Sequence, residues 1–377
     1  MLMDISVRNL GPFKDSATIS AKAGSPDEHP ENVLESKSCE QGLLGAVLLY
    51  GPNGSGKSVI LNSVGALRSI LSGAPASSFS NPFAFGSSDR TSEISITVGA
   101  RFVPYSYSLA FSDEGVVSES LYQYSTGRRS MVFLRSGSTY RYGKGCVRNR
   151  RSAEASVGAD MAFLPAAAAS DGGCSEALRE ILGITTEGMS LDAAVSMLSG
   201  NEELRSVVLR ALRIADFRIT DIVPGDDGVR FVHDVDGSEF PLPAGLESDG
   251  VKRAVEVLAV VCDALIGGKV VIVDDLDLHL HPRVVRWIVE QFSSERDPNS
   301  SQMVASTHDT TLLDLKNLMR RDQAYFADKR VRDGSATISR LTDHGGIRKD
   351  ADLQRAYFGW KMDSLPRISS SEQLLRR

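Results

Sequence analysis

Short apolar runs and looser alternations divide the chain into strand-like and helix-like stretches. The run 43–50 is apolar apart from one glycine and has the length of a buried strand, and 59–71 can form a helix. The alternation at 4–20 predicts short strands, which we expect to pair beside the strand at 43–50. Further strands are predicted at 93–98, 105–111, 116–124, 130–134 and 139–142, which together form an antiparallel lobe, and at 219–223 and 229–235.

Helical spacing returns at 175–217. Segment 21–41 shifts to Gly, Ser, Pro and acidic residues without periodicity, which predicts an exposed loop. The expected fold class is α/β, with a mixed β-sheet core, an antiparallel lobe and a helical insertion. The expected parts are an N-terminal lobe at 1–150, a helical insertion at 151–217 and a C-terminal lobe at 218–377.

The segment Gly51-Pro52-Asn53-Gly54-Ser55-Gly56-Lys57-Ser58 matches G-x-x-x-x-G-K-S at every position. It follows an expected strand and opens an expected helix, which is the context that a phosphate-binding loop (Walker A) of a P-loop NTPase requires. Backbone N–H groups of such a loop surround phosphates, and the helix N-terminus adds partial positive charge. Lys57 is expected to reach the β- and γ-phosphates, and Ser58 to bind magnesium. The other expected nucleotide contacts are Asn53, Gly54, Ser55 and Gly56.

A second motif begins at the β-branched run 270–273, which ends in Asp274 and Asp275. This is the pattern of a Walker B strand, in which Asp274 would hold the magnesium through water and Asp275 would orient or deprotonate the attacking water. Taken alone, the run is equally typical of an ordinary buried strand with a polar end.

The residues after this run carry a resemblance to a known group of proteins. Leu276-Asp277-Leu278-His279-Leu280-His281-Pro282 places Pro282 as the first residue of a helix, and Ser306-Thr307-His308 follows an expected strand. This combination resembles the ABC-type ATPases of the RecF, SMC and OLD group, within the broad AAA families of bacterial antiphage defence ATPases. In that group the matching histidine is the switch residue that senses the γ-phosphate, and it corresponds to His308. A metal site at His279, His281 and His308 is disfavoured, because their spacing lacks acids or cysteines in a ligand pattern.

The stretch 247–253 resembles the Ser-x-Gly-x-Lys-Arg signature of the defence ATPases. The resemblance implies that Ser248 and Gly250 bind the γ-phosphate held by an opposite subunit, so that ATP and Mg²⁺ join two heads into a homodimer or a higher homo-oligomer. A capped amphipathic helix is the simpler alternative. The resemblance also extends to 318–326 and 357–366.

One departure from the group concerns the water-positioning acid. Members usually carry Asp-Glu at the end of the Walker B strand, whereas this chain has Asp274-Asp275. The shorter carboxylate predicts slow hydrolysis, since a misplacement near 1 Å costs on the order of a hundredfold. Asp277 is the competing candidate, but we expect it to lie two residues further along an extended segment and to be structural.

Composition limits which binding partners and which cellular compartment we expect for the protein. The 377-residue chain has a net charge of −6, so any DNA contact must be a local patch. A basic run at 141–151, interleaved with Tyr140 and Tyr142, fits either phosphate contact or a solvated hairpin tip. The four cysteines form no C-x-x-C pair and indicate reduced thiols in a cytoplasmic protein. No signal peptide or membrane span is expected, hence no membrane partner.

The resemblance also implies a biological role. The chain lacks the coiled-coil arms of SMC proteins and carries no expected nuclease domain, so the head is expected to act as a sensor or regulatory subunit of an antiphage complex with a separately encoded effector, a nuclease or a toxin. A RecF-like ATP-dependent DNA repair protein and a non-hydrolysing nucleotide-binding scaffold remain alternatives, and a transporter subunit is disfavoured.

Overall fold

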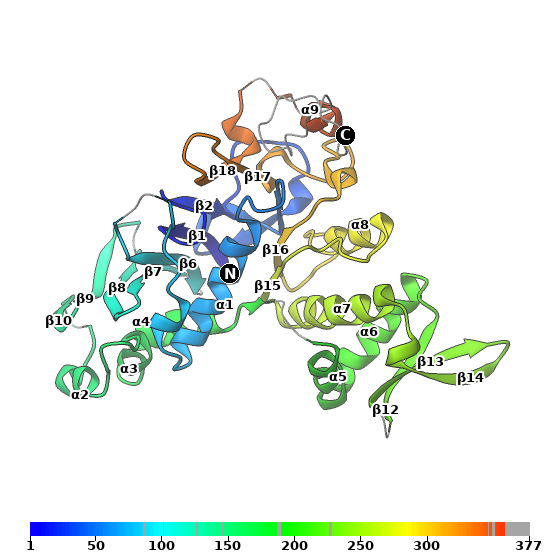
Figure 1. Cartoon of the computed structure of the whole chain (residues 1–377), viewed down its shortest axis with the longest axis horizontal. Coiled ribbons are helices and arrows are strands. Elements are labelled where there is room, and N and C mark those ends of the chain that lie inside the picture. The colour runs from blue at the N-terminus through cyan, green and yellow to red at the C-terminus, as the bar shows by residue number, and fades with distance from the viewer. Residues whose placement is uncertain are drawn as a thin grey trace, which may run out of the picture.

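The centre of the molecule is a six-stranded sheet with the order β11-β15-β16-β5-β17-β18 (Figure 1). The computed structural model describes residues 1–85, 88–100, 102–125, 127–144, 146–186, 190–225, 228–345, 347–348 and 351–358. The first five strands in this order are parallel, and β18 is antiparallel to β17. The α/β class with a mixed sheet is therefore confirmed. The strands are β5 (Ala46–Tyr50), β11 (Thr185–Thr186), β15 (Val270–Val273), β16 (Gln302–Ser306), β17 (Ala324–Lys329) and β18 (Ala336–Arg340).

Successive residues of β5 enter two different apolar clusters, one on each face of the sheet. Val47 and Leu49 pack in the cluster that contains α1 (Lys57–Leu71). Their neighbours on β5 pack in the cluster that contains α7 (Asp249–Gly267) and α8 (Pro282–Glu290). A strand buried on both faces has no polar face to show, which is why the sequence here is continuously apolar.

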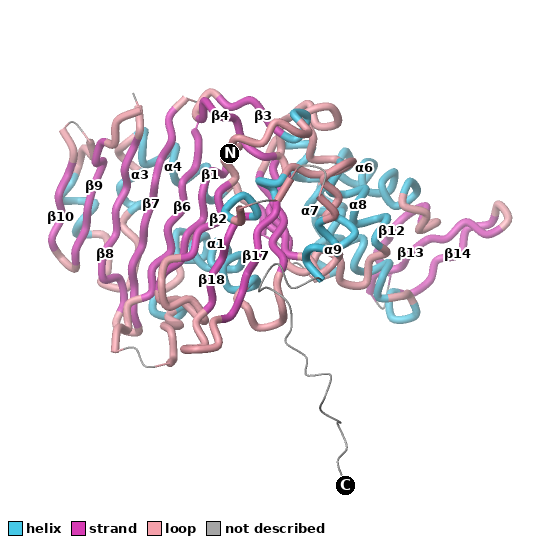
Figure 2. The backbone as a smooth tube through the Cα atoms, turned by 90° about the horizontal axis from the view of Figure 1, so that it is seen from above, coloured by secondary structure: helices cyan, strands magenta, loops and turns pink. Residues whose placement is uncertain are grey.

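A second sheet contains seven antiparallel strands in the order β10-β9-β8-β7-β6-β1-β2 (Figure 2). The five strands predicted for the lobe are confirmed. The prediction that the first strands pair beside β5 is wrong: β1 pairs with β2 and β6, because both edges of β5 are already occupied by β16 and β17. The strands are β1 (Leu2–Arg8), β2 (Ala17–Ser20), β6 (Ser92–Ala100), β7 (Val103–Ser112), β8 (Gly115–Gln123), β9 (Ser130–Ser136) and β10 (Thr139–Tyr142).

The range 151–217, expected as one helical insertion, is divided by the short strand β11. The helices before β11 pack in the cluster of α1, and those after it pack in the cluster of α7. Thr185 and Thr186 pair in parallel with β15. Two threonines are too short a run to show a period, so this strand could not be predicted from the sequence. The helices are α2 (Arg150–Ala155), α3 (Leu164–Ala168), α4 (Gly172–Leu182), α5 (Leu191–Gly200) and α6 (Glu202–Ile214).

Two smaller sheets complete the described structure. A three-stranded sheet projects beyond α5 and α7 (Figure 1); its strands are β12 (Ile219–Gly225), β13 (Gly228–Val235) and β14 (Ser238–Pro243). The hairpin of β3 (Val33–Ser36) and β4 (Cys39–Leu44) corrects the exposed loop expected at 21–41. Ala21, at the start of this range, is buried. Its carbonyl accepts the Leu44 N–H at 2.7 Å, which connects the segment to β4.

The chain's described part ends at α9 (Leu353–Phe358), so most of the resemblance at 357–366 lies outside the described residues. Among the described helices, none combines the length and apolar character needed to cross a bilayer. Short 3-10 helices occupy Pro30–Asn32, Ala76–Phe79, Ala244–Leu246, Thr310–Leu312, Arg321–Gln323 and Leu341–Asp343.

Candidate nucleotide-binding site

The phosphate loop connects β5 to α1, as the sequence predicts. Gly54 and Gly56 have φ values of 77° and 97°, which favour glycine. A Cβ added to Gly56 would lie 2.6 Å from the Phe13 ring, so packing also requires glycine there. A Cβ added to Gly54 would meet nothing within 4 Å. The loop is therefore held from behind at Gly56 and open to solvent at Gly54.

Lys57 lies at the start of α1 and points across the loop. Its Nζ donates to the carbonyls of Gly51 at 2.8 Å and Pro52 at 3.3 Å, and lies 3.2 Å from Nε2 of His308. Burial lowers the pKa of the Lys57 ammonium, while the nearby carboxylates of Asp275, Asp274 and Asp277 act in the opposite direction. The structure thus gathers a positive charge, three acids and a histidine at one edge of the sheet.

Asp274 and Asp275 follow β15 and are both organised by Ser306 of the neighbouring strand. The Ser306 hydroxyl donates to Oδ1 of Asp274 and accepts the Asp275 N–H at 2.8 Å. Because β16 lies between β15 and β5, Ser306 fixes the acids one strand away from the phosphate loop. Asp275 also lines a pocket of about 350 Å³ together with Asn53, Gly54, Lys57 and Ser58.

The chain turns directly after β15, which corrects the expectation of an extended segment up to Asp277. Asp275 has a φ of 47°, an uncommon value for a residue with a side chain. Arg253 of α7 stabilises this turn, since its Nη2 donates to the carbonyls of Asp274 at 3.1 Å and Asp275 at 3.2 Å. Burial lowers the pKa of Arg253, with Glu256 and the three acids opposing that effect.

His308 and Asp277 meet through the backbone. Oδ1 of Asp277 accepts the His308 N–H at 3.0 Å, and the His308 ring is the part that approaches Lys57. Asp277 therefore holds the turn that carries His308, which agrees with a structural role. His281 lies elsewhere, at the N-cap of α8, where its Nδ1 accepts the Arg283 N–H at 3.2 Å.

Ser248 and Gly250 begin α7. The Ser248 hydroxyl accepts the Val251 N–H at 3.2 Å, so it caps the helix. A Cβ on Gly250 would lie 3.0 Å from the His279 carbonyl, which brings α7 close to the turn after β15. Glu247, just before the cap, accepts the Ser248 N–H at 2.8 Å and contacts His233 of β13 at 2.7 Å. This end of α7 is apart from the chain's own phosphate-loop pocket, whose lining includes none of these residues.

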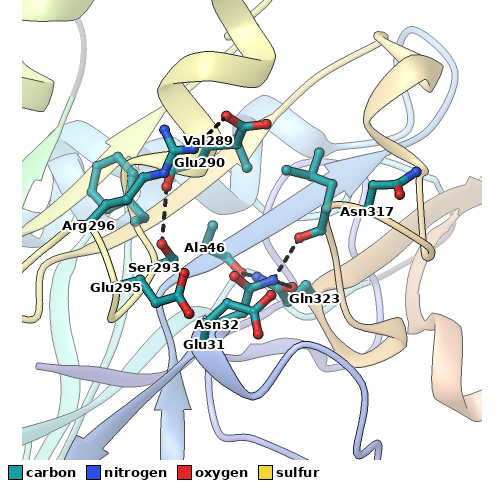
Figure 3. A pocket seen from close by; sticks show the side chains of 12 residues that line it. Glu31, Asn32, Ala46, Val289, Glu290, Ser293, Glu295, Arg296, Asn317 and Gln323 are labelled. Carbon is teal, nitrogen blue, oxygen red and sulfur yellow. Dashed lines mark hydrogen bonds and ion pairs between the residues drawn. The ribbon is translucent and has the colours of Figure 1, made fainter.

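A different pocket lies at the other end of β5, beside Ala46 (Figure 3). Its polar groups bind one another: Asn32 Nδ2 donates to the Leu318 carbonyl at 2.8 Å and to Gln323 Oε1 at 3.0 Å, and Gln323 Nε2 donates to the Ala46 carbonyl. These bonds join segments that are distant in sequence. The pocket contains none of the predicted site residues, and its satisfied polar groups indicate a structural role.

Two contributors were missed by the sequence reading. Ser306 and Arg253 were noted only as letters of motifs, and their contacts with Asp274 and Asp275 were not foreseen. The signal for Ser306 is its place at the end of an apolar run next to the histidine. The signal for Arg253 is a basic residue on the polar side of an otherwise apolar helix start.

A parallel sheet that presents a phosphate loop, two acids and a histidine at the same edge defines a P-loop nucleotide-binding fold. The chain matches the family described as "AAA domain, putative AbiEii toxin, Type IV TA system" over residues 47–145 and 164–314, and it belongs to that family. The resemblance to the ABC-type AAA ATPases is thereby confirmed. No curated protein matches the chain.

Several solved structures are similar to the chain at low identity. An SmcHead bound to the C-winged helix domain of ScpA has 14% identity and a TM-score of 0.47, covering 90% of this chain and 96% of the other. The SMC head domain from Thermotoga maritima has 13% identity and a TM-score of 0.40, covering 90% and 98%. An Smc head domain with an extended coiled coil, bound to the C-terminal domain of ScpA derived from Pyrococcus furiosus, has 13% identity and a TM-score of 0.44, covering 91% and 97%.

Proposed function

We propose that the protein is an ATPase head that binds ATP with Mg²⁺, hydrolyses it slowly and dimerises on it. The observation that carries this proposal is the approach of Lys57 Nζ to His308 Nε2 at 3.2 Å, beside a pocket that Asp275 and Ser58 also line. A phosphate group placed against the loop would meet the ammonium, the histidine and the acid together. These are the groups that phosphoryl transfer uses to bind phosphate and to position the attacking water.

The residues present fit a magnesium nucleotide. The backbone at Gly54 faces open space, Ser58 is exposed, and Asp274 adds a half-exposed carboxylate. Hydroxyl and carboxylate oxygens are the ligands that Mg²⁺ prefers, so Ser58 and Asp274 would hold the ion. When bound, the ion neutralises charge that develops on the phosphate oxygens.

The remaining steps belong to the chain's own side chains. Lys57 binds the β- and γ-phosphates, and Asn53, Gly54, Ser55 and Gly56 surround them with backbone N–H groups. Asp275 accepts a proton from the attacking water, and His308 contacts the γ-phosphate. Asp275 is one carbon shorter than the glutamate usual in the group, which makes turnover slow.

In this proposal the dimer forms when Ser248 and Gly250 of one subunit meet the nucleotide held by the other. Ser248 already orients backbone N–H groups at the start of a 19-residue helix, which favours an anion. The separation of this loop from the chain's own pocket supports action on a second subunit. Homodimers or higher homo-oligomers would then depend on ATP.

The biological role that we propose is that of a sensor or regulatory subunit in an antiphage complex with a separately encoded nuclease or toxin. The family's description, which names a toxin of a type IV toxin–antitoxin system, supports a place in such systems. The full chain alone should then show neither nuclease activity nor toxicity to its host. Purified protein that cuts DNA or RNA unaided would contradict the separate effector.

The central experiment measures ATP binding by calorimetry and phosphate release at steady state on the full chain. We expect binding that requires Mg²⁺ and slow turnover. Binding without turnover would support the scaffold alternative instead, and absence of ATP binding would overturn the proposal.

A further inference from the structure

The longest stretch of one charge sign lies in the antiparallel lobe. Between Glu119 and Glu154 the chain contains eight Lys or Arg residues and no Asp or Glu, although the whole chain carries −6. One of the eight, Arg135, is buried and donates to the carbonyls of Met161 and Gly158 at 2.6 and 3.1 Å. The other seven are exposed.

Strand register brings most of these residues to one end of the seven-stranded sheet. Val98 of β6 pairs with Tyr105 of β7, which pairs with Gln123 of β8, which pairs with Ser130 of β9. The turn between β8 and β9 and the segment after β10 therefore leave the sheet at the same end, since Gly143 N donates to the Val132 carbonyl at 3.0 Å. We call this end the basic end; it contains Arg128, Arg129, Lys144, Arg148 and Arg150, whereas Arg151 lines a pocket with Gly137 and Ser138 towards the other end.

Aromatic rings lie beneath two of these charges. The Arg129 guanidinium is 3.7 Å from the Tyr122 ring centroid, and that of Arg150 is 4.5 Å from the Tyr142 centroid. At the next turn along the same edge, Lys37 lies 5.3 Å over Phe102, whose side chain is 64% exposed. None of the ion pairs between described residues includes a member of the basic end.

This arrangement differs from an ordinary solvated surface. Exposed like charges repel one another, and evenly mixed surfaces relieve the repulsion with acids nearby. Here none of the five basic residues has an acid partner among the described ion pairs, and Glu154 of α2, which accepts the Tyr142 hydroxyl at 2.7 Å, offsets only part of the repulsion. A polyanion would relieve it by neutralising several charges at once and releasing counterions.

The basic end is also separate from the nucleotide site. The start of β1 lies level with the basic end, because Leu2 pairs with Val98 of β6. Beyond the other end of β1, the chain reaches Phe13, which lies beside Gly56 of the phosphate loop. At about 3.3 Å per residue, the seven residues of β1 place the basic end and the phosphate loop about 20 Å apart. Acids Asp113 and Glu114 lie on the β7–β8 turn, at the end opposite the basic end.

We propose that the basic end binds the sugar–phosphate backbone of a nucleic acid without reading its sequence. Arginines suit phosphate oxygens because their planar donors bind two oxygens at once. The exposed Phe102 ring and the half-exposed Tyr122 and Tyr142 rings provide aromatic surface on which unpaired bases stack, so single strands are the favoured form. This inference does not depend on ATP hydrolysis or on dimerisation.

The test uses the full chain and labelled thirty-nucleotide single-stranded and duplex DNA of about the same length, followed by fluorescence anisotropy over a salt series. The variant replaces Arg128, Lys144 and Arg148 by Gln, and the matched control replaces the exposed Arg283, Lys316 and Arg332 by Gln. We expect the first variant to lose affinity about tenfold or more and to lower the salt slope by about one unit per lost contact, with the control within about twofold of the parent. Unliganded melting temperatures check that both variants fold.

Three outcomes would overturn the inference: no binding by the parent at low salt, equal losses in variant and control, or poly-glutamate of the same charge bound as tightly as DNA. The last result would indicate an acidic protein as the partner. Lys57→Ala should keep the parent's DNA affinity, so failure of the proposed ATPase function leaves this test intact.

Discussion

β1 runs between the phosphate-loop end of the molecule and the basic end, and the charged side chains at these two ends have different surroundings. At the phosphate-loop end, three charged groups have buried or half-buried partners: Lys57 binds carbonyls, Arg253 binds the carbonyls of the acids, and Asp274 binds Ser306. At the basic end, Arg129 and Arg150 stack on rings, Arg150 also donates to the Val147 carbonyl, and both side chains face solvent. The difference follows burial, because a desolvated charge without a partner is costly whereas an exposed one is not. The first end is preorganised for chemistry, and the second is adaptable.

The largest expected effect is at Lys57. Lys57→Ala is expected to weaken ATP binding by more than about a hundredfold, because each hydrogen bond to a charged group contributes roughly 1.5–3 kcal/mol and the ammonium would make several. Calorimetry measures this, with Lys316→Ala as the matched control. The melting temperature without ligand should stay near the parent's. Unaltered ATP affinity would remove Lys57 from the site.

The next effect separates the two acids after β15. Asp275→Asn should reduce steady-state phosphate release roughly a hundred- to ten-thousandfold, which is the usual contribution of a general base. Asp277→Asn should retain turnover, since its contact with the His308 N–H is positional. Asp275→Glu should equal or exceed the parent. The reverse ranking of the two asparagine variants would show that Asp277 positions the water.

A third effect concerns assembly. Ser248→Arg removes the helix cap and adds bulk where the second subunit is proposed to bind. ATP binding by the monomer should remain, while ATP-dependent association measured by light scattering should be lost. Ser190→Arg, which removes the N-cap hydroxyl of α5, is a control for capping alone. Assembly that persists in Ser248→Arg would place the subunit contact elsewhere.

The smallest expected effect concerns the ion pair between Glu28 and Arg321, which lies away from the nucleotide site. Burial would raise the pKa of Glu28, but hydrogen bonds from Arg321 outweigh it and lower that pKa to about 2. The folded pKa lies below the ordinary value of 4.5, so this stabilisation is present above that value and is lost as pH falls towards 2. Arg321→Met should flatten the acid-side decline in the free energy of unfolding, measured with urea. An unchanged slope, as expected for Arg283→Met, would show that the pair contributes nothing.

Local signals predicted local structure well. The phosphate loop occupies eight contiguous residues, and each lobe strand shows its own alternation, so neither depends on distant partners. The sheet partner of β1 could not be read in the same way, because β6 lies some 85 residues away and any edge with free hydrogen bonds would satisfy the alternation.

The organisation of the acids was equally beyond the sequence. Ser306 reaches Asp275 only because β15 and β16 are neighbours, and Arg253 arrives from a helix that precedes both strands. The positive φ of Asp275 reverses the expected extended path, and nothing in an Asp-Asp-Leu sequence requires that value. Motif letters identified the residues, whereas tertiary contacts determine how they point.

The contact between Glu247 and two different elements has a structural consequence. One carboxylate oxygen accepts the Ser248 N–H and the other contacts Nε2 of His233, so a single side chain links the projecting β12–β14 sheet to the N-cap of α7. The sheet is about 25 Å long at most along β13, at about 3.4 Å per residue, and this one carboxylate joins it to the start of α7. Arg253, a little over one turn further along α7, binds the carbonyls of the paired acids. The projecting sheet and the acids are therefore linked through the first turns of a single helix.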